Sequence, residues 1–140
     1  MLAPGPADLI LSIEGERDIV NARQQAREVA KRLGFSMVDQ SRITTAVSEL
    51  TRNVVRYATD GRGQLLIRAL PRSERGVGLE IVVADDGPGI PDIAEAMRAG
   101  VTAGAGLGMG LPGTKRLMDD MQIDSGPGRG TVVTIRKWHR

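Results

Sequence analysis

The 140-residue sequence contains no cysteine, which excludes disulfide bonds, zinc sites built on thiolates and cysteine nucleophiles together. Aromatic residues make up only 2% of the chain, so the core must be aliphatic and stacking platforms for single-stranded nucleic acid are not expected. No apolar run approaches the roughly 20 residues of a membrane span. The formal net charge is only +2 and the basic residues are scattered, so we predict a cytoplasmic protein with neither a nucleic-acid partner nor a membrane partner.

A chain of this length holds one hydrophobic core, so residues 1–140 are predicted to form a single domain. Alternating apolar residues predict strands at 9–14, 64–71, 79–85 and 131–138, and helical spacing predicts helices at 17–33, 39–58 and 111–123. Gly34 is expected to end the first helix and Asp39 to cap the second, whose buried stripe is predicted to be Ile43, Val47, Leu50, Val54 and Tyr57. This order predicts an α+β sandwich with helices on one face of a mixed sheet.

Two polar residues on the second predicted helix border its buried stripe. Glu49 and Asn53 are four residues apart, so their side chains lie on nearly the same side of the helix. A carboxylate can take a proton, and a carboxamide oxygen can be one ligand of a magnesium ion that keeps its water and phosphate ligands. Any surface helix offers such a pair, so the spacing alone is weak evidence. Arg52 and Arg56 face away from the stripe, where solvation is favoured over contact with a partner protein.

Asp85 ends the third predicted strand, on the face that also carries Leu79, Ile81 and Val83. A carboxylate on a buried face needs a partner because unpaired buried charge is costly. Asp85 therefore either caps a nearby backbone group or accepts a hydrogen bond from a ligand, such as the exocyclic amine of a purine. The sequence "DDGPG" that it opens is also a favourable turn.

The stretch "GAGLGMGLPG", residues 104–113, is the strongest local signal in the chain. Successive glycines that lead into a helix expose backbone N–H groups at the positive end of its dipole, which suits phosphate groups. The loop does not follow the first strand of a parallel unit, as a Rossmann fingerprint does, and it lacks the closing Gly-Lys-Ser/Thr of a Walker A loop. A glycine loop without any ligand is the alternative.

The motifs occur in one order within the chain, and in that order the sequence resembles the GHKL ATP-binding superfamily, which includes gyrase, the heat-shock chaperone ninety, histidine kinases and MutL. Glu49 and Asn53 match its N box, and Asp85, Gly87 and Gly89 match its G1 box. The G2 box is matched by Gly106, Gly108 and Gly110, and the closing glycine-threonine segment by Gly128, Gly130 and Thr131. The wording of "SELTRNVVRYA" and "GLGMGLPGTKRLMD" is most similar to the RsbT-type serine/threonine switch kinases of bacterial partner-switching systems.

The resemblance implies the Bergerat fold, a two-layer α+β sandwich, with ATP and Mg²⁺ as its ligands. It implies that Glu49 is the catalytic residue, orienting or deprotonating the acceptor hydroxyl, and that Asn53 binds the magnesium ion. It also implies that residues 91–106 form a lid over the nucleotide. The residues implied to bind the nucleotide are Asn53, Asp85, Gly87, Gly89, Gly104, Gly106, Leu107, Gly108, Met109, Gly110 and Thr131.

The partners are implied by the resemblance as well. Kinases of this type phosphorylate serine or threonine on STAS-domain scaffold and antagonist proteins of a stressosome, and after release they activate a PP2C-type phosphatase. Two alternatives remain open. The first alternative to the switch kinase is an anti-sigma factor kinase that holds a sigma subunit, and the second is an adaptor that binds ATP without transferring phosphate.

Overall fold

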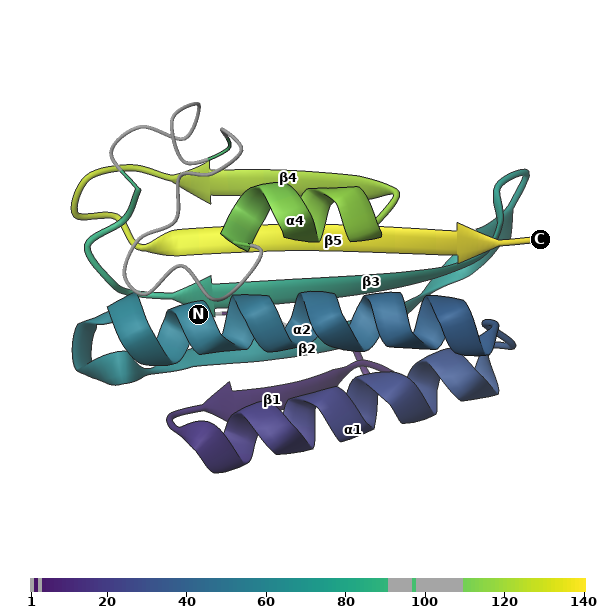
Figure 1. Cartoon of the computed structure of the whole chain (residues 1–140), viewed down its shortest axis with the longest axis horizontal. Helices are drawn as coiled ribbons and strands as arrows, with labels where there is room; N and C mark the ends of the chain where they lie inside the picture. Colours follow the sequence, from purple (N-terminus) through teal and green to yellow (C-terminus); the bar gives the residue numbers. More distant parts are fainter. Residues whose placement is uncertain (1, 3, 91–96, 98–109) are drawn as a thin grey trace.

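The computed structural model describes residues 2, 4–90, 97 and 110–140. The described residues form one five-stranded sheet in the order β1-β2-β3-β5-β4, with three α-helices, α1, α2 and α4, on one of its faces (Figure 1). The elements are β1 (Leu9–Ile13), α1 (Glu16–Arg32), α2 (Met37–Tyr57), the short 3₁₀ helix η1 (Thr59–Gly61), β2 (Gly63–Ser73), β3 (Gly76–Asp85), α4 (Gly110–Leu117), β4 (Asp120–Ser125) and β5 (Thr131–His139). No helix within these residues is long and apolar enough to cross a membrane.

The core lies between the helices and the sheet and is aliphatic, as the composition predicts. Ile43, Val47, Leu50 and Val54 of α2 are each at most 2% exposed, which confirms four members of the predicted stripe. The prediction that Tyr57 is the fifth buried member is wrong, because this residue is 40% exposed in the last turn of the helix. The helices therefore pack on the sheet through small and branched side chains, which hold α2 close to the strands.

The ends of α1 and α2 follow from local hydrogen bonds. Gly34 ends α1 as predicted: it has φ of 86°, and the N–H groups of Gly34 and Phe35 donate to the carbonyls of Lys31 and Ala30, both at 3.0 Å. The predicted cap of α2 is wrong. Ser36 is the N-cap, and its Oγ accepts a hydrogen bond from the backbone N–H of Asp39 at 3.1 Å. Asp39 lies three residues inside the helix, where its charge favours the helix dipole.

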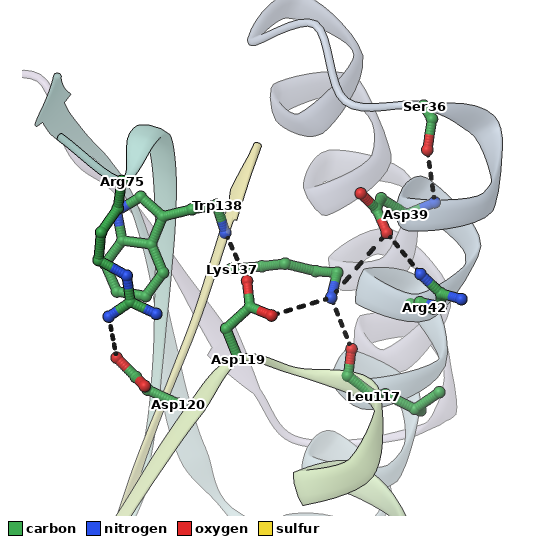
Figure 2. A network of polar contacts seen from close by, with 9 residues as sticks. All are labelled: Ser36, Asp39, Arg42, Arg75, Leu117, Asp119, Asp120, Lys137 and Trp138. Carbon is green, nitrogen blue, oxygen red and sulfur yellow. Dashed lines mark hydrogen bonds and ion pairs between the residues drawn. The ribbon is translucent and has the colours of Figure 1, made fainter. Parts of the chain in front are cut away.

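The largest correction concerns residues 118–123, which the spacing predicts as helix. α4 ends at Leu117, and residues 120–125 form the strand β4, which pairs with β5 from Asp120↔Arg136 to Ser125↔Thr131. Two tertiary contacts end the helix there. The buried Lys137 ammonium donates to the Leu117 carbonyl at 3.0 Å (Figure 2). The Asp119 N–H donates to the Arg136 carbonyl at 3.0 Å.

The extra strand also changes the type of sheet. Every strand pairing among the described residues is antiparallel, so the predicted mixed sheet is wrong, although the α+β sandwich is confirmed. A chain that continued directly from α4 into β5 would enter the sheet parallel to β3. Because β4 crosses the molecule first, β5 starts at the opposite end and runs antiparallel to β3. The β2–β3 hairpin is confirmed and is longer than expected, since only Glu74 and Arg75 separate its strands.

Candidate functional site

One end of the sheet presents a row of small and polar residues in register. Gly63 of β2 pairs with Asp85 of β3, Asp85 pairs with Thr131 of β5, and Thr131 pairs with Ser125 of β4. Alternation along the strands puts the Asp85 and Thr131 side chains on the face that carries the core residues Val83 and Val133, beneath the helices. We call the set Gly63, Asp85, Thr131 and Ser125 the end row.

Asp85 is the charged member of the end row, and among the described residues its carboxylate accepts one hydrogen bond. Its Oδ1 accepts a hydrogen bond from the Gly87 N–H at 2.8 Å, and the described residues provide no other hydrogen bond to this carboxylate. Burial raises the pKa of the Asp85 carboxyl above its ordinary value; the Gly87 N–H offsets part of this rise and the neighbouring charge of Asp86 adds to it. Asp85 therefore caps the Gly87 N–H through Oδ1, and its other carboxylate oxygen has no hydrogen-bond donor among the described residues.

The turn after Asp85 interlocks with the turn between β4 and β5. The Gly128 N–H donates to the Pro88 carbonyl at 2.7 Å, and the Ile90 N–H donates to Ser125 Oγ at 2.8 Å. Gly89 has φ of 82°, and a Cβ on it would collide with the Gly126 carbonyl oxygen. The glycines of these turns thus allow two loops, 37 residues apart at Gly89 and Gly126, to pack backbone against backbone beside the end row.

Glu49 occupies a buried position between α2 and the start of α4. The residue is only 8% exposed, Oε1 lies 3.1 Å from Arg52 Nη1, and Oε2 accepts a hydrogen bond from the Gly110 N–H at 3.4 Å. Gly110 has φ of 62°, a conformation that suits glycine. The carboxylate predicted on the second helix and the last glycine of the predicted G2 box are therefore neighbours in space. Asn53 is partly exposed one turn further along α2.

The structure brings together some of the predicted residues. Glu49 meets Gly110, Asp85 and Gly87 are hydrogen bonded, and Asp85 and Thr131 are cross-strand partners. The last turn of α2 and the end of β3 lie at the same end of the molecule (Figure 1), and a Cβ on Gly87 would come within 2.8 Å of Ala58 Cα. The remaining predicted residues, Gly104, Gly106, Leu107, Gly108 and Met109, lie outside the described residues, as does most of the predicted lid.

Two residues of the site were missed by the sequence analysis. Ser125 contacts both turns and Thr131, and the alternation of Met121, Ile123 and Ser125 would have indicated it had β4 been recognised. Arg52 was assigned to solvent or a partner, whereas its guanidinium pairs with Glu49. Its i,i+3 spacing from Glu49 is the signal that was available.

Comparison with known proteins shows the family to which the chain belongs. The family model described as "Histidine kinase-like ATPase domain" matches residues 14–137. The chain belongs to this family. It is also 53% identical over 126 residues, 89% of this chain and 92% of the relative, to the serine/threonine-protein kinase RsbT of Bacillus subtilis strain 168. This degree of similarity makes the chain a member of the RsbT serine/threonine-protein kinases within the histidine kinase-like ATPases.

More distant members of the histidine kinase-like ATPases have other names. The anti-sigma F factor of Caldanaerobacter subterraneus subsp. tengcongensis is 31% identical over 121 residues, 84% of this chain and 82% of the relative. Among solved structures, the RsbU and RsbW domains of Rv1364c from Mycobacterium tuberculosis match with a TM-score of 0.64 at 22% identity, covering 97% of this chain and 32% of that one. The mycobacterial sensor histidine kinase MprB matches with a TM-score of 0.55 at 17% identity, covering 94% and 97%. The structural matches support the predicted fold.

Proposed function

We propose that residues 1–140 form a single kinase domain that transfers the γ-phosphate of ATP to serine or threonine of STAS-domain scaffold and antagonist proteins. The observation that carries this proposal is the position of Glu49, a buried carboxylate beside the first N–H of α4, where the predicted G2 box ends. A carboxylate near the phosphate loop can act on an incoming hydroxyl group. The 53% identity to a serine/threonine-protein kinase supports the same reaction.

The end row is proposed to receive the adenine base. Asp85 has one oxygen without a donor in the described part of the chain and Thr131 lies opposite it, so both can accept hydrogen bonds from a base. Gly87 and Gly89 keep the adjoining backbone free of side chains. The triphosphate is proposed to lie along the N–H groups of 104–110. For Gly104, Gly106, Leu107, Gly108 and Met109 this role stays a prediction.

The residues on α2 fit a magnesium ion that is held largely by phosphate and water. Within the part of the chain that the structure describes, no group of three or more histidine or acidic residues could hold a metal by itself. The Asn53 carboxamide is a hard oxygen ligand on the same side of α2 as Glu49, so it is the proposed protein ligand. Bound there, Mg²⁺ would neutralise charge on the transferred phosphoryl group.

In the proposed step, the oxygen of a serine or threonine hydroxyl forms a bond to the γ-phosphorus as the bond to the β–γ bridging oxygen breaks. Glu49 Oε2 or Oε1 accepts the hydroxyl proton, and ADP leaves with the bridging oxygen. Arg52 contacts Oε1 and the Gly110 N–H donates to Oε2, so each carboxylate oxygen keeps a lone pair that can accept the hydroxyl proton. At the start of α4 the Gly110 N–H donates to Glu49 and Pro112 has no N–H, so the N–H groups of Leu111 and Gly113 are the proposed donors to the negative charge.

After phosphorylation, the released kinase is proposed to activate a PP2C-type phosphatase in a cytoplasmic stress-signalling pathway. The similarity to RsbT supports this partner-switching role. The similarity to anti-sigma F factors favours a second candidate, a kinase that holds a sigma subunit. An adaptor that binds ATP without transferring phosphate is the third candidate, and Glu49 argues against it.

The test is intact-mass spectrometry of a STAS-domain protein after incubation with Mg²⁺, ATP and the kinase. We expect one added phosphate with the unaltered chain and a rate at least about 100-fold lower with Glu49→Gln, because a positioned base contributes about that much or more. The affinity for ADP, measured by calorimetry, should change by less than about threefold.

The matched control is Glu28→Gln, which removes an exposed carboxylate from α1 and should leave the rate unchanged. Equal phosphate transfer by Glu49→Gln and the unaltered chain would contradict the role of Glu49. Binding of ADP without any phosphate transfer would favour the other candidates, and capture of a purified sigma subunit would then separate the anti-sigma kinase from the adaptor.

A further inference from the structure

The hydroxyl of Ser125 is the centre of a small hydrogen-bond network at the end row. Its Oγ accepts from the Ile90 N–H at 2.8 Å, lies 2.8 Å from the Gly130 carbonyl and lies 2.9 Å from Thr131 Oγ1. A serine hydroxyl has one proton to donate and two lone pairs to accept with. The three contacts therefore use its full capacity, and only certain proton arrangements are consistent with all of them.

The Gly130 carbonyl decides between these arrangements. A carbonyl can only accept, and among the described residues Ser125 is the hydrogen-bond donor to it outside the sheet ladders, so the Ser125 proton points at Gly130. Thr131 must then donate its own proton to Ser125 Oγ. The opposite arrangement, with Ser125 donating to Thr131, leaves the carbonyl of the buried Gly130 without this donor, and a buried acceptor without a partner is costly.

The consequence for Thr131 is that its hydroxyl has no proton left to donate to a ligand, because that proton is already donated to Ser125 Oγ. Its oxygen can present only lone pairs, and it is partly exposed next to Asp85. Directly opposed residues of an antiparallel pair have Cβ atoms about 5 Å apart, so the carboxylate and the hydroxyl oxygen form an adjacent pair of acceptors. Two acceptors side by side suit a ligand group with two donors, which an exocyclic amine is. They repel a carbonyl oxygen at the same position.

We propose that Ser125 is a positioning residue that determines base specificity. By accepting the hydrogen bond of the Thr131 hydroxyl, it makes the site select a 6-aminopurine over a 6-oxopurine nucleotide. This inference rests on the proposed function, since it assumes that the nucleotide base binds at the end row. The same hydroxyl fixes the Ile90 backbone, so it also joins the two interlocking turns.

The test compares two nucleotides that differ at purine position 6, ADP and inosine diphosphate, by calorimetry in the presence of Mg²⁺. We expect the unaltered chain to prefer ADP. In Ser125→Ala the Thr131 hydroxyl is free to rotate and donate to a 6-oxo group, so the ratio of the two dissociation constants should fall about tenfold, the scale of one hydrogen bond. Ser125→Thr retains the hydroxyl and should retain the preference of the unaltered chain.

The ratio separates this role from a purely structural one. A Ser125 that only held the turns together would weaken ADP and inosine diphosphate equally in Ser125→Ala, and an unchanged ratio overturns the proposal. Thermal melting checks that each variant folds. If Ser125→Ala does not fold, Ser125→Cys, with a much weaker acceptor of similar size, should show the same fall in the ratio. An unaltered chain that binds ADP but has no preference overturns this inference alone, whereas one that binds neither nucleotide overturns the proposed function with it.

Discussion

The two ends of the sheet treat interior charge in opposite ways. At the end where β5 finishes, the Lys137 side chain is 8% exposed and has three oxygen partners: Leu117 O at 3.0 Å, Asp119 Oδ1 at 3.6 Å and Asp39 Oδ1 at 3.9 Å (Figure 2). At the end where β3 finishes, Asp85 has one backbone N–H. Among the described residues, the first charge has several partners and the second has one.

The number of partners that a buried charge has in the described structure distinguishes a structural charge from a candidate binding group. The Lys137 cluster, formed by Lys137, Leu117, Asp119 and Asp39, joins the end of α4, the start of β4 and the first turn of α2. Beside this cluster, the guanidinium carbon of Arg75 lies 3.6 Å from the centre of the Trp138 ring, and Arg75 Nη1 lies 3.1 Å from Asp120 Oδ2. Removing one member of a buried, fully partnered charge cluster is destabilising, whereas a buried charge with few partners is a candidate for a binding site.

The largest effect is expected from Asp85→Asn. The asparagine keeps an oxygen for the Gly87 N–H but removes the charge and one acceptor, so ADP affinity should fall about 100-fold by calorimetry. Asp86→Asn is the matched control, because Asp86 is exposed and adjacent. Unchanged ADP affinity in Asp85→Asn would mean that the base does not bind at the end row.

The same variant has a pH signature. The folded pKa of Asp85 is raised above the ordinary value of 3.8, so the folded state holds more protons than the unfolded state between these two values. The free energy of unfolding of the unaltered chain therefore loses this contribution as pH rises through that window. Asp85→Asn should lack this fall and be at least as stable at neutral pH, as measured by urea denaturation at several pH values.

The next effect is on stability and comes from the other end. Lys137→Met keeps much of the side-chain volume but leaves the Leu117 carbonyl without its donor, so the free energy of unfolding should fall by about 2 to 3 kcal/mol. ADP affinity should stay within about twofold. Lys31→Met, at an exposed position on α1, should change stability by less than about 0.5 kcal/mol. A large loss of ADP affinity in a folded Lys137→Met would show that the two ends are coupled.

The smallest effect is expected from Ser36→Ala at the start of α2. Loss of the hydrogen bond from the Asp39 N–H should cost about 1 kcal/mol in urea denaturation, without a change in nucleotide affinity. Ser41→Ala, at an exposed position inside the same helix, is the control and should be neutral or slightly stabilising. Equal stability of Ser36→Ala and the unaltered chain would argue against the cap.

Much of the molecule could be predicted because its signals are local. The periodicity of α1 and α2, the stop at Gly34 and the β2–β3 hairpin depend on residues close in sequence. Only the family resemblance placed Glu49 near the glycines that include Gly110, because the two residues are 61 positions apart and no local pattern links them. The cap of α2 at Ser36 was missed although its signal is local, since Asp39 is an equally good capping residue type.

The sequence by itself determined the aliphatic core, the α+β class and the order of the nucleotide-binding motifs, since these depend on composition, periodicity and short patterns. Only the tertiary structure decided where α4 ends, that every described strand pairing is antiparallel, and that Ser125, Thr131 and Asp85 share a row. The physical reason is the same in each case. Residues 118–123 fit a helix or a strand, and pairing with β5 together with the Lys137 hydrogen bond to Leu117 selects the strand.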